Sequence, residues 1–139
     1  MAGSTPTLIT AAPTGAEADK SAVPALPVTL DLSHTAASGS DALIMATELG
    51  SRLAHVHLAD GTGSPAGPVP DEHLVPGRGG QPCGELLALL PPSGYPGAVV
   101  VEVKTNRAPT REARMADLAE SLAFARQHLA VAAGSASRE

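Results

Sequence analysis

Short apolar runs rich in β-branched residues alternate with helix-like segments over most of this 139-residue chain. Strands that alternate with helices pair in parallel through right-handed crossovers, because a parallel neighbour can be reached only by a long connection. The pattern therefore predicts an α/β fold made of successive βα units. The predicted strands are 28–32, 53–58 and 98–103, and the predicted helices are 41–49, 82–90 and 110–131.

The predicted helices begin at residues that favour helix starts. Ser40 is expected to cap the first helix, with Asp41 in its first turn, where the helix dipole favours an anion. Pro82 suits the first position of the second helix, and Thr110 can cap the third. The third helix carries an apolar stripe at spacings of three and four, which predicts its buried face. That stripe is Met115, Leu118, Leu122, Ala125 and Leu129.

The two ends of the chain lack such periodicity. Residues 1–27 mix small residues with four prolines, so the apolar area that they could bury would not offset an ordering cost of about 1–2 kcal/mol per residue. We expect a flexible, disordered tail there and a second tail at 134–139. The folded domain is therefore expected at 28–133.

The net charge limits the kinds of partner that the chain can bind, and the cysteine content limits the cellular compartment in which we expect it. A formal net charge of −5 with 9 Lys and Arg argues against a nucleic-acid interface, which needs clustered cations. A single cysteine, Cys83, excludes an intramolecular disulfide and suits a reducing cytoplasm, where we expect it to be a small buried apolar side chain. The sequence shows neither a secretory signal nor a run of about 18 apolar residues, so we expect a soluble cytoplasmic protein that binds a small polar ligand.

Polar side chains that can bind metal or transfer protons stand at the ends of the three predicted strands. Asp31 ends the first, His57 nearly ends the second, and Glu102 lies near the end of the third. Active sites of parallel α/β folds collect at the carboxyl ends of strands. Glu102 would be costly to bury alone, so it is expected at the open end of its strand or bound to a metal.

The strand at 53–58 also predicts which faces are apolar. Val56 and Leu58 share one face, and His55 and His57 share the other, because successive side chains alternate. We interpret His55 as a structural hydrogen-bonding group in preference to a ligand.

A long loop rich in glycine and proline follows this strand and contains further candidates. Asp60 at its start can bond nearby backbone N–H groups, a role we prefer to chemistry. Asp71 and His73 are two residues apart and could converge on one ion, or could simply be solvated. The sequence Gly77-Arg78-Gly79 loosely resembles a phosphate-binding loop, in which Arg78 would meet an anionic substrate.

Taken in chain order, these segments resemble the last three βα units, strands six to eight, of the xylose-isomerase-like (β/α)8 TIM barrels. That family includes sugar phosphate isomerases and epimerases and the apurinic endonucleases. The resemblance covers residues 28 to about 131 and implies a partial TIM barrel. The motifs that carry it are Asp31-Leu-Ser-His34, His55-Val-His57-Leu-Ala-Asp60, Asp71-Glu-His73, Pro76-Gly77-Arg78-Gly79, Gly94-Tyr95-Pro96-Gly97 and Val101-Glu102-Val103.

The resemblance implies a divalent metal, such as manganese, zinc, cobalt or magnesium, at the carboxyl ends of the strands. Asp31, His57 and Glu102 match the ligands that strands six to eight supply. In the epimerase branch two glutamates pass a proton to and from the carbon beside a carbonyl, through an enediolate that the metal stabilises. Glu102 matches one of these glutamates. The implied activity is that of a sugar or sugar phosphate isomerase or epimerase, with a small sugar as substrate.

Three further residues match positions whose role differs between branches. His34 matches a position that contacts substrate in the sugar isomerases and a metal in the endonucleases. Asp71 and His73 match a pair that binds an extra metal in the endonuclease branch. A metal-dependent endonuclease relative is therefore the alternative activity, although the acidic charge speaks against binding DNA.

The family's earlier strands, including the one with the other glutamate, have no counterpart here, because residues 1–27 cannot hold five βα units. Such a piece has two open strand edges and one uncovered sheet face, which invite pairing with another chain. We therefore expect a truncated product, a misplaced start, or a half that needs a homo-oligomer or a complementary half-barrel chain. The third hypothesis is a non-catalytic assembly module.

Overall fold

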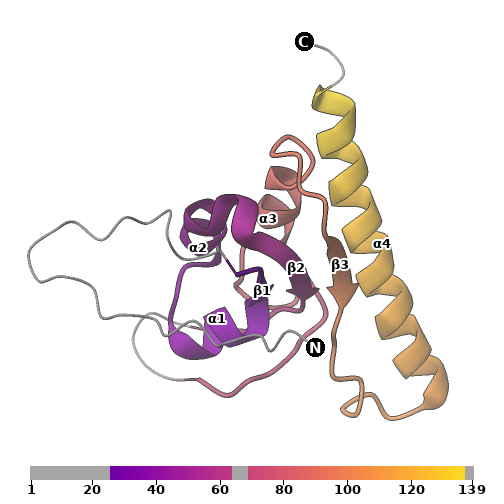
Figure 1. Cartoon of the computed structure of the whole chain (residues 1–139). Coiled ribbons are helices and arrows are strands. Elements are labelled where there is room, and N and C mark those ends of the chain that lie inside the picture. Colours follow the sequence, from indigo (N-terminus) through magenta and orange to yellow (C-terminus); the bar gives the residue numbers. More distant parts are fainter. Residues whose placement is uncertain (1–25, 64–68, 137–139) are drawn as a thin grey trace, which may run out of the picture.

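The computed structural model of the chain describes residues 26–63 and 69–136, and these residues form helices around one small parallel sheet (Figure 1). Most of the predicted N-terminal tail, residues 1–25, lies outside this described part. The elements in chain order are β1 (Val28–Asp31), α1 (Leu32–Ser38), α2 (Ala42–Leu49), the 3-10 turn η1 (Gly50–Arg52), β2 (Leu53–Leu58), α3 (Cys83–Leu89), β3 (Ala98–Val101) and α4 (Arg111–Ala136).

The sheet has the order β1-β2-β3, and both pairs are parallel, which confirms the predicted α/β fold with successive βα units. The register aligns Asp31 with His57, and His57 with Val100. Because side chains alternate along a strand, the three aligned residues lie on the same face of the sheet. This fold is consistent with part of a TIM barrel.

Helices cover the opposite face of the sheet. Val56 and Leu58 are fully buried there and pack with Leu86 and Leu87 of α3 in one apolar core. Helix α4 runs alongside β3 and packs against α3 (Figure 1). The apolar run at 98–103 predicted a strand covered on both faces, but Val100 is 42% exposed in the described part of the chain. The histidine face of the sheet is the open one.

Local capping explains two differences from the predicted elements. Helix α1 was not predicted; it starts at once after β1 because Asp31 Oδ1 accepts hydrogen bonds from the backbone N–H groups of Ser33 and His34. The cap of α2 is Asp41, not Ser40, since the Asp41 carboxylate accepts from two N–H groups of the first turn.

Helix α4 is capped by Thr110 as predicted, through a bond from the Ala113 N–H to the hydroxyl, but it extends to Ala136 instead of ending near 131. Its predicted buried stripe is wrong in part. Met115 and Leu122 are 58% and 44% exposed, whereas Ser121 is fully buried. The buried face of α4 is narrower than predicted and consists of the small residues Ser121, Ala125 and Ala132.

Cys83 is 1% exposed and belongs to the core, as predicted. Burial raises the pKa of its thiol far above the usual range, so the thiolate that would react is not populated at neutral pH. Among the described residues, no helix is long and apolar enough to cross a membrane.

Candidate metal centre at the strand ends

The two carboxylate oxygens of Asp31, at the end of β1, differ in their hydrogen-bond partners. Oδ1 caps α1 through the N–H groups of Ser33 and His34, at 2.9 and 3.1 Å. Oδ2 is buried and accepts no hydrogen bond within the described part of the chain. A buried carboxylate oxygen without a partner is costly, and buried charges are usually paired or bound to metal. Asp31 Oδ2 is therefore the atom around which a metal centre would form.

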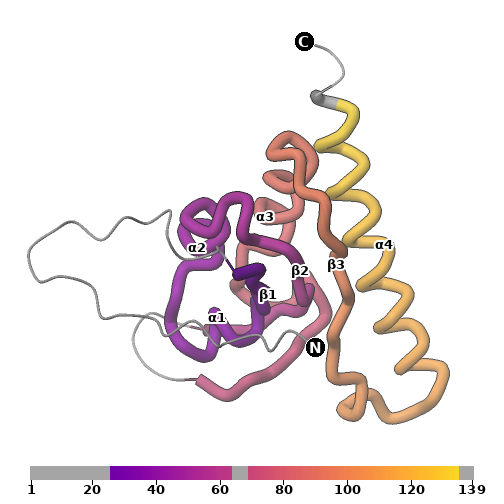
Figure 2. The backbone as a smooth tube through the Cα atoms, viewed as in Figure 1, coloured from indigo at the N-terminus to yellow at the C-terminus, as the bar shows by residue number. Residues whose placement is uncertain are grey.

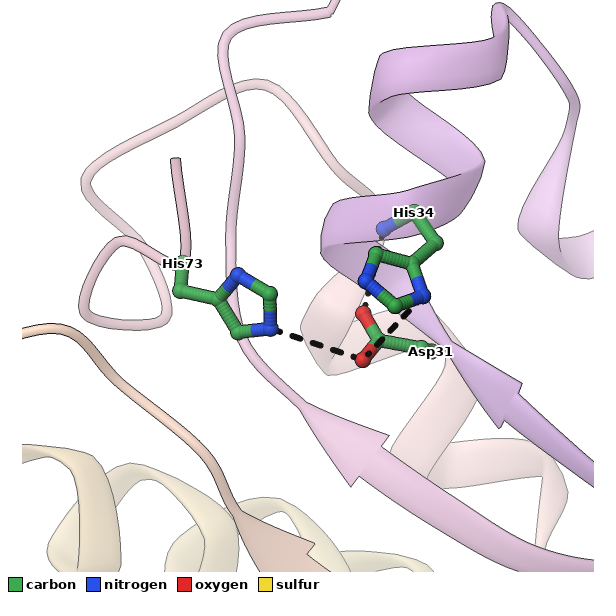
Figure 3. Close-up of side chains that lie close together, drawn as sticks. All are labelled: Asp31, His34 and His73. Atoms are coloured by element: carbon green, nitrogen blue, oxygen red, sulfur yellow. Dashed lines mark hydrogen bonds and ion pairs between the residues drawn. The ribbon is translucent and has the colours of Figure 1, made fainter. Parts of the chain in front are cut away.

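Three imidazole nitrogens surround this oxygen. His34 Nδ1 lies 3.6 Å from Oδ2, His57 Nδ1 lies 3.4 Å away, and His73 Nε2 lies 3.5 Å away. Figure 3 shows the rings of His34 and His73 turned toward the Asp31 carboxylate, His34 from α1 and His73 from the loop after β2. These contacts are too long for good hydrogen bonds.

The distances from Asp31 Oδ2 to these three nitrogens are close to the spacing of two ligands of one divalent ion. Two ligands of a tetrahedral zinc ion, each about 2.0–2.1 Å from the metal, lie about 3.3–3.4 Å apart. The described residues form two groups of three that could hold an ion, Asp31 with His57 and Glu102, and Asp31 with His34 and His73. Carboxylate oxygen and imidazole nitrogen suit zinc, manganese and cobalt. The residues present therefore fit the implied metal.

Glu102 completes the first group, as the sequence predicted. It directly follows β3, where its N–H donates to the Leu58 carbonyl and extends the pairing with β2. Its Oε2 lies 2.5 Å from His57 Nδ1, the same nitrogen that lies 3.4 Å from Asp31 Oδ2, so one ring nitrogen faces both carboxylates. The Glu102 side chain is 50% exposed, so it stands at the open end of the strand rather than in the core.

His73 reaches the site because the long loop folds back over the strand ends. The loop makes an antiparallel bridge at which Asp60 and Leu74 exchange both backbone hydrogen bonds, each 2.8 Å long. The segment after residue 68 passes the tip of the β2 arrow before the chain enters α3 (Figure 1), and the tube in Figure 2 follows the same course.

The backbone of His73 has a φ of 47°, in the left-handed region that non-glycine residues rarely adopt. Two hydrogen bonds hold it there. The His73 N–H donates to Ser33 Oγ, and the His73 carbonyl accepts from the Lys104 N–H, both at 2.9 Å. Strained backbone held by its surroundings is common at functional sites. The arrangement fixes the ring beside Asp31.

Asp71 belongs to neither group of three, although the sequence suggested it as a ligand. It lies behind His73, where its Oδ1 accepts from the Ser33 hydroxyl at 2.7 Å and its Oδ2 pairs with Lys104 at 3.4 Å. Partial burial works to raise the pKa of Asp71, but the hydrogen bond from Ser33 and the electrostatic effect of the neighbouring His73 and Lys104 outweigh it, and the pKa lies below its ordinary value.

Asp60 shapes the loop rather than the centre, which confirms the preferred interpretation. Its carboxylate is fully buried and accepts four backbone N–H bonds of 2.8–3.0 Å. A Cβ on Gly79 would lie 2.4 Å from Asp60 Oδ1, so only glycine allows this close approach. The donors are Gly61, Gly77, Gly79 and Gln81.

Arg78 points away from the strand ends. Its guanidinium pairs with Asp117 at 2.9 Å and with both carboxylate oxygens of Glu120, so it ties the loop to α4. The structure does not bring it together with Asp31.

Sequence reasoning missed Ser33 and Lys104, which hold the loop residues in place. The period-two alternation that puts Val100 and Glu102 on one face also extends to Lys104, and it could have indicated that residue.

A family model described as xylose isomerase-like TIM barrel matches residues 15–128 of the chain. The chain belongs to this family. It is 55% identical over 101 residues to uncharacterized proteins of Mycobacterium tuberculosis and Mycobacterium bovis, and 52% identical over 101 residues to one of Mycobacterium leprae. Each alignment covers 73% of this chain and 35% of the relative, so the chain spans about a third of the length of these relatives. No solved structure matches it significantly.

Proposed function

We propose that the chain carries the metal-binding and proton-transferring end of a divalent-metal-dependent sugar or sugar phosphate isomerase or epimerase. The observation that supports this most is the buried, unpartnered Asp31 Oδ2 with three imidazole nitrogens 3.4–3.6 Å away. Family membership favours sugar isomerase or epimerase chemistry, and the net charge of −5 favours a small polar substrate over nucleic acid.

Asp31, His57 and Glu102 would hold the ion. When bound, a divalent ion supplies a Lewis acid that polarises a carbonyl oxygen and favours loss of a proton from the neighbouring carbon. The buried Asp31 keeps its position because Oδ1 is fixed by the start of α1.

Glu102 is the residue that we assign to proton transfer. A general base must reach the proton that it removes, and a half-exposed carboxylate at the open end of β3 can approach a substrate on the histidine face of the sheet. His57 Nδ1 lies 2.5 Å from Glu102 Oε2, so the imidazole helps to fix the position of that carboxylate. His34, which is 64% exposed, stands at the rim and is placed to contact the substrate hydroxyls.

The test is exchange of deuterium from solvent into the carbon beside the carbonyl of a ketose or its phosphate, followed by NMR with manganese present. This step needs only one base, so Glu102 alone can support it. We expect Glu102→Gln to lower the exchange rate at least about 100-fold, the usual contribution of a general base. Glu112→Gln, the same change at an exposed position of α4, serves as the control and leaves the rate unchanged. Equal exchange in the parent and Glu102→Gln would refute the assigned role.

A hydrolase of the apurinic-endonuclease type is the second candidate. The second group of potential ligands, Asp31 with His34 and His73, favours it, because that branch uses more than one metal. Binding of abasic DNA that weakens steeply with salt would support this alternative.

A further inference from the structure

His55 lies on the open face of the sheet, one row of residues below the candidate metal centre. The register aligns it with Thr29 of β1 and Ala98 of β3, and the next row on the same face contains Asp31 and His57. Both neighbours across the sheet are exposed, and His55 itself is half-buried. His57, two positions further along β2, is the residue of the centre that follows it on the same strand and face.

The ring of His55 contacts the ring of His57. The two ring centroids are 5.0 Å apart and the ring planes stand at 81°, an edge-to-face arrangement that aromatic pairs prefer. Within the described residues the His55 side chain forms no hydrogen bond and no ion pair. The structural hydrogen-bonding role expected from the sequence therefore has no partner there, and the contact that His55 does make is ring packing.

The polar contacts of the His57 ring are confined to one nitrogen. Nδ1 lies 3.4 Å from Asp31 Oδ2 and 2.5 Å from Glu102 Oε2. A histidine that binds a metal usually has its ring orientation fixed by a hydrogen bond at the other nitrogen. In the part of the chain that the structure describes, His57 Nε2 has no such partner. Another contact must therefore orient this ring.

The torsion that sets the position of His57 Nδ1 is soft. A histidine ring turns about its Cβ–Cγ bond in a broad and roughly two-fold profile, so the torsion itself does not select one orientation. A half turn would exchange Nδ1 with the carbon Cδ2 and direct a C–H group at the two carboxylates. The His57 side chain is 31% exposed on an open face, so a packed neighbour is needed to hold one orientation, and the perpendicular ring of His55 is such a neighbour.

We propose that His55 is a positioning residue for His57, whose ring it holds by edge-to-face packing with Nδ1 directed at Asp31 and Glu102. A ring that is already held in this orientation binds a divalent ion more tightly, because less freedom is lost on binding. The role of His57 as a ligand rests on the proposed function, whereas the effect of His55 on the ring is measured without metal.

The first experiment measures the order of the His57 ring in the zinc-free chain, by 13C relaxation of the ring C–H bonds in protein labelled at histidine. We expect the order parameter to fall below about 0.6, the range of flexible groups, in His55→Ala. It should stay at the parent value in His55→Phe, which keeps a ring and removes both nitrogens. The matched control is His128→Ala, which removes another half-buried histidine, one whose ring lies 4.1 Å from that of Phe124 within α4. This control leaves the order of His57 unchanged.

Calorimetric titration with zinc then measures the consequence for binding. We expect His55→Ala to weaken zinc binding about 10-fold, the lower end of the usual effect of losing a group that orients a ligand. His55→Phe and His128→Ala should bind zinc as tightly as the parent. Equal weakening in His55→Ala and His55→Phe would overturn the proposal, because it would mean that a nitrogen of His55 acts and not its ring packing.

Equal ring order in the parent and His55→Ala would also overturn the proposal, and so would equal zinc affinity in these two chains. His55→Leu, which fills a similar volume without a ring, replaces the alanine variant should that variant fold poorly, as judged by circular dichroism. A His57 ring that loosens in His55→Ala, in a parent that binds no zinc, would support this inference and contradict the metal centre of the proposed function, so the two claims fail separately.

Discussion

Asp31 both caps helix α1 and belongs to the proposed metal centre, and each role uses a different carboxylate oxygen. Oδ1 caps α1 and Oδ2 faces the imidazoles. Substitution by alanine removes both roles, whereas asparagine keeps an oxygen for the cap and loses the charge, since Asn caps helices about as well as Asp. Asp31→Asn is therefore the cleaner probe of the metal centre.

The buried carboxylate of Asp60 leads to a prediction about the stability of the loop that it holds. Its four backbone donors bond to both oxygens, so the amide of Asp60→Asn would place a donor against two N–H groups. We expect the free energy of unfolding to fall by about 2–4 kcal/mol in urea denaturation, because buried groups left without partners cost about 1–3 kcal/mol each.

Asp41→Asn provides the comparison for this substitution. Asp41 is an exposed helix cap, where asparagine substitutes with a change of a few tenths of a kcal/mol. Similar losses in the two variants would show that the loop does not depend on the buried carboxylate.

At the scale of elements, helix α4 shows where periodicity predicts a helix but not its contacts. Successive residues of a helix turn by about 100°, so Leu118 and Leu122 lie on a stripe next to the one that is buried. Both stripes consist of apolar or small residues, so the sequence does not distinguish them. Which stripe faces the core depends on α3 and β3, which no local pattern specifies.

Substitution of neighbouring residues tests this correction. We expect Ser121→Lys to lower the free energy of unfolding by about 2 kcal/mol or more, because Ser121 is fully buried and a lysine would be forced into packed surroundings. Leu122→Lys, at a position that is 44% exposed, should cost less than about 1 kcal/mol. Thermal unfolding of the two variants distinguishes the orientations, and the reverse order would contradict the packing of α4.

Much of the fold follows from the sequence, because strand and helix periods and β-branched runs are local signals. The strand at 53–58 coincides with β2, and three strand-end residues predicted from sequence, Asp31, His57 and Glu102, do meet. Helix α1 escaped prediction because its cap is also the end of a strand. The roles of Asp71 and Arg78 depended on which partners the folded loop brought to them, Ser33 and Lys104 in one case and α4 in the other.

At the scale of the whole molecule, one face of the sheet is covered and the histidine face is open within the described residues. β1 and β3 are the edge strands of this sheet, and Val100 of β3 is 42% exposed on the histidine face. Open edges and apolar surface favour pairing with another chain. Association with a second copy or with a complementary half-barrel remains our expectation for how this face is completed.

The measurement that tests the central claim most directly is the metal content of the purified, extensively dialysed chain, by elemental mass spectrometry. We predict close to one zinc, manganese or cobalt ion per chain, lost in Asp31→Asn and in His57→Ala and retained in Asp41→Asn, the same substitution at an exposed cap. A chain that stays free of metal after reconstitution, or one whose metal survives both substitutions, would contradict a centre at the strand ends.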